Sequence, residues 1–279
     1  MSIKFQHLFT LFLITVLNPS VGQAQAWTKT KGKGFYKLDF SSIQAADVFD
    51  TKGKVIPSRS IGTKVTSFYG EYGLTNKITA IAYVPFLVSN SISAQTGTVA
   101  LLSAKNNKFG DVDLGFRFAL PVKNIAMSAT IFLGLPTGDA KNTNTLYTGD
   151  GEFNQMVKIA AGMSGKRWWG QSAVGFNNRT KSFSDEFRYD VEFGYKFFND
   201  RFLTILKING VESFNNGTVK AAPTGLYSNN VEYGGIGPEF LYYANAKKTV
   251  GVSVRIAGAF KGQNILAAPS FSGGVFAEF

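Results

Sequence analysis

The sequence has no cysteine, and its single histidine, His7, lies close to the N-terminus. The absence of cysteine excludes disulfides and thiolate chemistry. Hydrolases of the Ser-His and Cys-His kinds need an imidazole that titrates near neutral pH, and zinc sites are built largely on His and Cys. We therefore expect no catalytic residue, no metal site and no cofactor, and we interpret the protein as a non-enzyme.

The remaining metal candidates are the acidic residues Asp139, Asp150 and Glu152. Carboxylates bind Ca²⁺, but the spacing of these three matches no complete calcium loop. We interpret them as members of a solvated loop.

Long apolar runs are also missing, and charged residues make up only 17% of the chain, against roughly 25% in soluble domains. No stretch after Ala26 reaches the roughly 18 apolar residues of a spanning helix. Two classes remain. One is a soluble β-sandwich, and the other is an outer-membrane β-barrel, in which lipid-facing and lumen-facing residues alternate.

The first 26 residues have the pattern of an export signal. Lys4 and His7 precede a short apolar run at 8–17, and Ala24-Gln25-Ala26 is an A-x-A cleavage pattern. A membrane anchor is the alternative, but about ten apolar residues are too few to span a bilayer as a helix. We expect a signal peptide at residues 1–26, cleavage after Ala26 and a single domain at residues 27–279.

The strongest strand pattern covers residues 187–197. Phe187, Tyr189, Val191 and Phe193 alternate with charged residues or glycine without a slip. A period of two indicates a β-strand with one apolar and one ionic face. Because glycine, alanine and serine often share the ionic face elsewhere in the chain, this face suits a lumen that must not be overfilled.

Loop lengths favour the barrel. About twelve strands of about ten residues are predicted, which is the length that crosses a bilayer when tilted. Connections after even-numbered strands are short, whereas several after odd-numbered strands are long and polar, including 47–62, 89–108 and 213–228. Transmembrane barrels have this asymmetry. The fold class predicted is all-β: a transmembrane, antiparallel, up-and-down β-barrel.

Charged and polar residues on the predicted inner face are the candidate functional residues. They form either a cross-strand network of ion pairs that makes the barrel rigid or a constriction that selects solutes by charge. The predicted lumen-facing residues are Asp111, Asp113, Arg117, Glu152, Asn154, Lys158, Arg188, Asp190, Glu192, Lys196 and Arg255.

Two further groups of residues predict contacts with the membrane. Aromatic residues at predicted strand ends are typical of a girdle at headgroup level; they are Trp168, Trp169, Phe197, Phe198, Tyr242 and Tyr243. Basic residues near the first long loop could meet anionic lipopolysaccharide; they are Lys52, Lys54, Arg59 and Lys64. No pattern indicates a nucleic-acid partner.

Several strings carry a resemblance to a known family. They are Leu135-Pro136-Thr137-Gly138-Asp139, Gly149-Asp150-Gly151-Glu152-Phe153-Asn154-Gln155, Gly194-Tyr195-Lys196-Phe197-Phe198, Gly237-Pro238-Glu239, and the run 264–272. The chain resembles the outer-membrane proteins grouped with the meta-pathway of phenol degradation, including XagA-like proteins. The final Phe279, with Val275 and Phe271 before it, is similar to the C-terminal signal of outer-membrane proteins, which implies the barrel assembly machinery as a partner.

The resemblance implies a transport barrel for small aromatic or hydrophobic solutes in the bacterial outer membrane. The first hypothesis for function is accordingly a passive channel, with small solutes as its partners. The alternative is a non-conducting surface or structural protein, acting in adhesion, in the matrix or in envelope integrity, which the long loops motivate.

Overall fold

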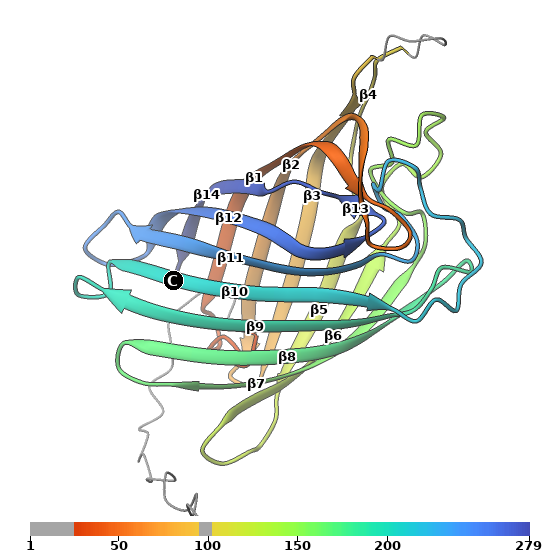
Figure 1. Ribbon diagram of the computed structural model, residues 1–279. Helices are drawn as coiled ribbons and strands as arrows, with labels where there is room; N and C mark the ends of the chain where they lie inside the picture. The colour runs from red at the N-terminus through yellow and green to blue at the C-terminus, as the bar shows by residue number, and fades with distance from the viewer. Residues whose placement is uncertain (1–24, 95–101) are drawn as a thin grey trace, which may run out of the picture.

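The structure, a computed structural model, describes residues 25–94 and 102–279, and in these ranges it is built from strands (Figure 1). Residues 1–24 of the predicted signal peptide lie outside the described ranges. The strands are β1 (Gly34–Phe49), β2 (Val55–Thr75), β3 (Ile78–Ile92), β4 (Ala104–Lys108), β5 (Val112–Ala119), β6 (Ala126–Leu135), β7 (Asn154–Ser164), β8 (Trp168–Arg179), β9 (Glu186–Phe197), β10 (Phe202–Ser213), β11 (Glu232–Tyr243), β12 (Val250–Gln263), β13 (Ile265–Leu266) and β14 (Ser270–Glu278).

Twelve of these strands form a closed antiparallel ring. Each pairs with its neighbour in the chain, while β4 and β13 are short additions to β3 and β1. The ring closes where β14 pairs with β1, and Gly34 and Phe279 exchange backbone hydrogen bonds at this junction. Closure pairs every strand on both sides, as backbone in hydrocarbon requires. The predicted twelve-stranded transmembrane barrel is therefore confirmed.

Side-chain exposure follows the alternation along the strands. In β9 the outward Val191 and Phe193 are 45% and 51% exposed, whereas the inward Glu192 is 8% exposed. The same holds around the ring, where Leu, Val, Ile and Phe side chains form the outer surface. An apolar outside around a polar inside is the pattern of a barrel in lipid. Among the described residues, no helix is long and apolar enough to cross a membrane.

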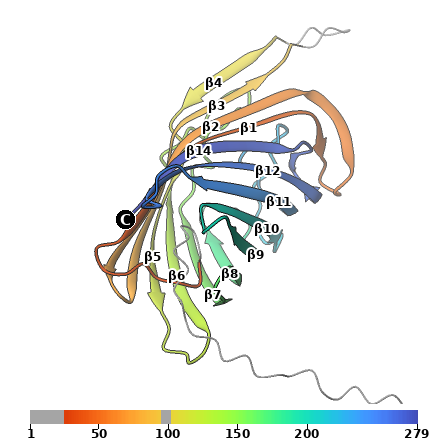
Figure 2. The same cartoon turned by 90° about the vertical axis from the view of Figure 1, so that its left-hand side faces the viewer.

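The two ends of the barrel differ in their connections. We call the end with turns 76–77, 120–125, 165–167, 198–201 and 244–249 the short-turn end, and the opposite end the long-loop end. The junction of Gly34 and Phe279 lies at the short-turn end. At the long-loop end, the extended β1, β2 and β3 project beyond the ring (Figures 1 and 2).

Two of the predicted long loops are partly strand. Residues 47–62 were expected to be a loop, but β1 and β2 continue as a hairpin with a turn at only 50–54. Similarly, β3 continues to Ile92 and pairs with β4, so much of 89–108 is a second hairpin, and residues 95–101 lie outside the described ranges. Beyond the lipid both faces of a strand can be polar, so the alternation that reveals a spanning strand is lost. The third predicted loop, 213–228, matches the irregular connection 214–231 between β10 and β11.

The pairing of β11 with β12 contains a bulge at Gly234-Gly235. Gly234 pairs with Lys261 and Gly235 with Ala259, so the extra residue is Phe260 of β12. A bulge bends its strand and breaks the alternation locally. This irregular part of the wall lies near the long-loop end.

Two aromatic residues expected in the outer girdle lie inside the barrel. Trp169 and Tyr243 are 0% and 4% exposed and belong to an inner apolar cluster, whereas Tyr242 is 44% exposed on the outside. Adjacent residues of a strand point to opposite faces, so a Trp-Trp or Tyr-Tyr pair cannot lie wholly in the girdle. Gly194 makes room for Trp169, because a Cβ on that glycine would lie 2.0 Å from the indole ring.

Candidate functional site

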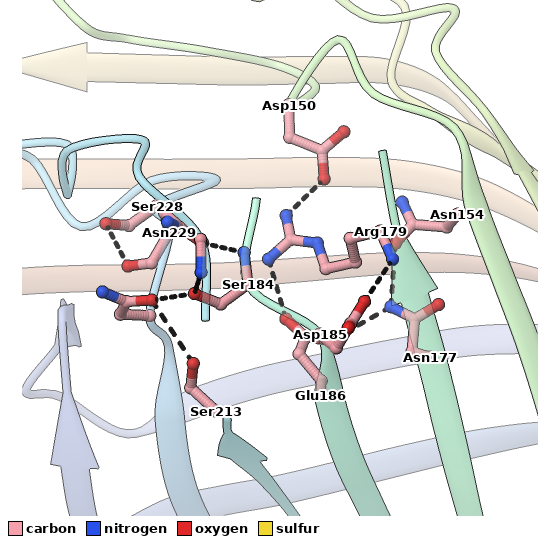
Figure 3. Close-up of polar contacts among 12 residues, drawn as sticks. Asp150, Asn154, Asn177, Arg179, Ser184, Asp185, Glu186, Ser213, Ser228 and Asn229 are labelled. Carbon is pink, nitrogen blue, oxygen red and sulfur yellow. Dashed lines mark hydrogen bonds and ion pairs between the residues drawn. The ribbon is translucent and has the colours of Figure 1, made fainter. Parts of the chain in front are cut away.

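The lumen is the candidate site, and its most heavily charged part lies near the long-loop end. Arg179, the last residue of β8, forms ion pairs with Asp150 and Glu152 of the β6–β7 loop and with Glu186 of β9, each at 2.9 Å (Figure 3). Arg188 adds a second cation to Glu186 at 2.6 Å. We call these five residues the Arg179 cluster.

Burial shapes the acid–base properties of the loop residues in this region. It raises the pKa of Glu152, and the neighbouring Asp150 adds to the rise, against the opposing effect of Arg179. Burial also raises the pKa of Asp111, to about 6. The Asp111 carboxylate accepts hydrogen bonds from the backbone amides of Gly138 and Asp150, at 2.8 and 2.9 Å. Asp111 therefore joins the ends of the β6–β7 loop to the start of β5.

A second network crosses the middle of four strands. Lys207 of β10 pairs with Glu239 of β11 at 2.7 Å and with Glu192 of β9 at 3.5 Å. Lys37 of β1 pairs with the same Glu239 at 3.1 Å and with Asp39 at 2.8 Å. Two lysines thus pair with three carboxylates on the inner wall, which leaves one negative charge in excess. We call them the Lys207 network.

Two further ion pairs lie on the opposite part of the wall. Arg117 of β5 and Glu71 of β2 are 3.0 Å apart, and their side chains are 2% and 1% exposed. Lys158 of β7 and Asp190 of β9 are 2.5 Å apart. Buried charges are stable only when paired and hydrogen-bonded, and both pairs satisfy that condition.

The segment 25–29 enters the lumen from the short-turn end, and the exposed residues 30–33 connect it to β1. Arg117 Nη1 donates a hydrogen bond to the Trp27 carbonyl at 3.1 Å, Ser128 Oγ donates to the Gln25 carbonyl at 2.6 Å, and the Ala26 amide donates to Gln171 Oε1 at 2.9 Å. These partners lie on β5, β6 and β8. The segment therefore fills part of the lumen and uses inner polar side chains as its partners.

Trp27 links this segment to the apolar cluster near the short-turn end. It packs against a group of buried residues that includes Phe35, Trp169 and Phe276. A cavity of about 410 Å³ opens beside it, lined by Lys196, Asp200 and Glu278, among others. The lumen is thus narrowed by apolar side chains at one end and by charge at the other.

The predicted lumen residues fall into groups in the structure. Glu152 and Arg188 belong to the Arg179 cluster, Glu192 to the Lys207 network, and Arg117, Lys158 and Asp190 to separate ion pairs. Asn154 Oδ1 accepts a hydrogen bond from Asn177 at 2.8 Å. Asp113 lies beside its register partner Gly134. Asp111 lies in the loop before β5, Lys196 lines the short-turn cavity, and Arg255 lines a separate cavity.

Many members of these ion-pair groups are not among the predicted lumen-facing residues. They are Lys37, Asp39, Glu71, Asp150, Arg179, Glu186, Lys207 and Glu239. Their partners are set by the register of neighbouring strands, and a single sequence does not contain this information. The alternation of apolar and polar residues along β10 is enough to predict that Lys207 faces the lumen, because its neighbours Leu206 and Ile208 are apolar.

The acidic residues weighed as calcium ligands do not converge. Asp150 and Glu152 are bound to Arg179, whereas Asp139 accepts a hydrogen bond from Asn106 at 3.2 Å. Within residues 25–94 and 102–279, no group of three acidic or histidine side chains could hold a metal ion.

A solved outer-membrane channel shares this fold. The COG4313 outer membrane channel from Pseudomonas putida F1 is 12% identical, with a TM-score of 0.66 and coverage of 93% of this chain and 100% of that one. The KdgM porin is 7% identical (TM-score 0.49; 87% and 99% covered), and the CymD monoaromatic hydrocarbon channel is 8% identical (TM-score 0.45; 90% and 89% covered).

Comparison of the sequence with curated proteins gives no match. Comparison with family models gives one over residues 49–272, to the family described as "Putative MetA-pathway of phenol degradation". This range spans β2 to β12 and the start of β14, which is most of the barrel. The chain belongs to that family.

Proposed function

We propose that this protein is an outer-membrane channel through which small, partly apolar solutes pass without an energy source. The observation that carries the proposal is the closed ring with an apolar outer surface and a charged, hydrogen-bonded inner wall. A polar inner wall is the pattern of barrels that enclose a water-filled channel. The fold shared with an outer membrane channel supports the same proposal.

The contents of the lumen favour small solutes over large ones. After the proposed cleavage, the chain from Trp27 to Lys29 still occupies part of the cross-section, and Trp27 joins the apolar cluster beside it. A solute crossing at this level meets aromatic rings and aliphatic side chains as well as charge. We infer that size and partial apolarity, rather than charge alone, set its passage.

Reconstituted protein provides the test. Liposome swelling and planar-bilayer recordings are to be made with the wild-type chain and with a variant that lacks residues 27–31, which include the inner stretch from Trp27 to Lys29. Lys52, which lies in the exposed turn between β1 and β2, supplies a control in Lys52→Gln. The proposal predicts slow swelling with small solutes, faster swelling after the deletion, and no change in the control. No swelling with any small solute, before or after the deletion, would overturn it.

A non-conducting surface protein is the second candidate, because the buried ion pairs and the inner segment also suit a lumen that is simply filled. The long-loop end then becomes the functional surface. Its extended hairpins carry Lys52, Lys54, Arg59 and Lys64, which we propose meet lipopolysaccharide. A deletion strain with unchanged solute uptake and altered surface attachment would favour this candidate.

The proposed location includes an export route. We infer cleavage after Ala26, so that Trp27 becomes the first residue, with the short-turn end in the periplasm. Phe279 is proposed to engage the barrel assembly machinery. Its ring is 54% exposed and stacks on Tyr36, with ring centroids 5.4 Å apart. N-terminal sequencing of the protein from outer-membrane fractions tests both the cleavage site and the location.

A further inference from the structure

A cavity of about 430 Å³ lies in the lumen wall near the long-loop end. It is bounded by the inner faces of β11 and β12, by β13, and by the part of the β10–β11 loop around Leu226 and Tyr227. This volume falls in the range of roughly 300–1,000 Å³ that is typical of small-molecule sites. The bulge at Phe260 adjoins the cavity and makes this stretch of the wall irregular.

Most of the lining is apolar. Ile43, Leu226, Ile265 and Leu266 supply aliphatic side chains, and Tyr227 and Tyr233 supply two rings. Leu226 and Leu266 are 7% and 8% exposed and belong to one buried apolar cluster. The packing of this cluster holds the apolar side of the cavity in place. A ligand with an apolar group the size of one ring would cover this apolar surface. Removing apolar surface from water is favourable by roughly 25 cal/mol per Å².

The one charged residue lining this cavity, within the described part of the chain, is Arg255. No carboxylate of the described residues lies within 4.0 Å of its guanidinium. Within the described ranges its one hydrogen bond runs from Nη2 to Asn209 Oδ1 at 3.4 Å, and its buried Nε has no hydrogen-bond partner there. This cation differs from the other inner-wall arginines, each of which is paired with a carboxylate.

The neighbours of Arg255 explain why it stays free. Glu239 is its register partner on β11, but that carboxylate is turned toward Lys207 and Lys37, at 2.7 and 3.1 Å. On the other side, the register partner is the neutral Ser272 of β14. Neither register partner therefore places an anion on the guanidinium.

We propose that this cavity binds a small monocarboxylate with an aromatic or short aliphatic body, with its carboxylate on Arg255. The proposal names a solute class for the channel and in that respect rests on the proposed function. A guanidinium matches a carboxylate with two parallel hydrogen bonds, and the low polarity of the lining strengthens that contact. A single cation in apolar surroundings selects a single negative charge and disfavours polyanions, which would leave other charges unpaired.

Benzoate is the probe, and benzamide is its neutral counterpart of nearly the same shape. Binding is to be measured by calorimetry on the full mature barrel in lipid nanodiscs, where no detergent competes for the cavity. We expect benzoate to bind at least tenfold more tightly than benzamide. Arg255→Gln should remove this preference, whereas Arg255→Lys should keep part of it. Lys123→Gln, in the exposed turn between β5 and β6, is the control and should keep all of it.

A second variant tests the cavity itself. A Cβ on Gly235 would lie 3.6 Å or more from its neighbours, in ordinary contact, so Gly235→Leu can enter the cavity without backbone strain. We expect Gly235→Leu to lower the affinity for benzoate and for benzamide at least tenfold. The apparent size shift between heated and unheated protein on electrophoresis verifies that each variant is folded.

Two results overturn the proposal: benzoate and benzamide binding equally, or Arg255→Gln leaving benzoate affinity unchanged in a folded barrel. Both concern binding, which does not require conduction. Swelling assays with small neutral solutes test the channel separately, so a conducting barrel with no benzoate preference defeats this inference alone.

Discussion

Arg179 and Arg255 lie on the same inner wall but in opposite electrostatic settings. Arg179 reaches three carboxylates at 2.9 Å, whereas Arg255 reaches none within 4.0 Å among the described residues. Arg117 is intermediate, with one carboxylate at 3.0 Å. The comparison teaches that an arginine fully paired by the wall is part of the structure, whereas one left unpaired beside a cavity is available to a ligand.

Arg179→Met is the sharpest test of this order, in which Arg179 is paired with the most carboxylates and Arg255 with none. Removing the cation leaves Asp150, Glu152 and Glu186 buried together, and breaking a buried ion pair costs about 3–5 kcal/mol. We expect a loss of about 5 kcal/mol in the free energy of unfolding, measured by urea titration of the barrel in lipid. The loss should shrink as the pH falls, because protonation removes the unpaired charges. A loss no greater than that of Arg255→Met would contradict the ranking.

Arg117→Met comes next. It leaves one buried carboxylate, Glu71, without its cation and removes the hydrogen bond to the Trp27 carbonyl. We expect a loss of about 3 kcal/mol in the free energy of unfolding and a rise in single-channel conductance, because the inner segment loses an anchor. Arg117→Lys is the matched control and should recover most of the stability. Unchanged conductance would show that the segment does not limit conduction.

Ser272→Asp converts the free arginine into a paired one. Ser272 lies opposite Arg255 across β12 and β14, and cross-strand ion pairs contribute roughly 0.2–1 kcal/mol. We expect a small gain in the free energy of unfolding and at least a tenfold loss of benzoate affinity. Ser272→Asn, of the same size without the charge, should keep the affinity. Retained binding in the Asp variant would mean that Arg255 is not the anchor.

The smallest expected effect concerns Asp111. Burial raises its pKa to about 6 in the folded state, above the ordinary value of 3.8. Its contribution to stability is therefore present below pH 3.8 and is lost as the pH rises through about 6. Because the carboxylate is partly exposed, we expect less than about 1 kcal/mol. Hydrogen exchange at the Gly138 and Asp150 amides, corrected for intrinsic rates, should detect the change, and Asp111→Asn should abolish it.

The barrel itself was predictable because the membrane imposes the period of two. The run 187–197 alternates without a slip, and its outward and inward faces match β9. Beyond the lipid this constraint ends, so the hairpin of β1 and β2 was predicted as a loop over 47–62.

The ion-pair partners depend on a different kind of information. Lys37 meets Glu239 across 202 residues of chain, and only the closure of the ring brings β1 near β11. The inner segment around Trp27 has no period to detect, and Arg179, the last residue of β8, finds two of its partners in the β6–β7 loop. What the sequence lacks in these cases is the register between strands.

The junction between Gly34 and Phe279 has a consequence for biogenesis. β1 can pair with β2 early, but its pairing with β14 requires the chain through Phe279, because Gly34 and Phe279 are bonded to each other. Until then, the edges of the sheet stay unpaired, and unpaired strand edges can pair with other chains. Such late closure over great sequence distance is intrinsically slow. Until the ring closes, the incomplete barrel therefore needs a partner that covers its open edges and prevents their pairing with other chains.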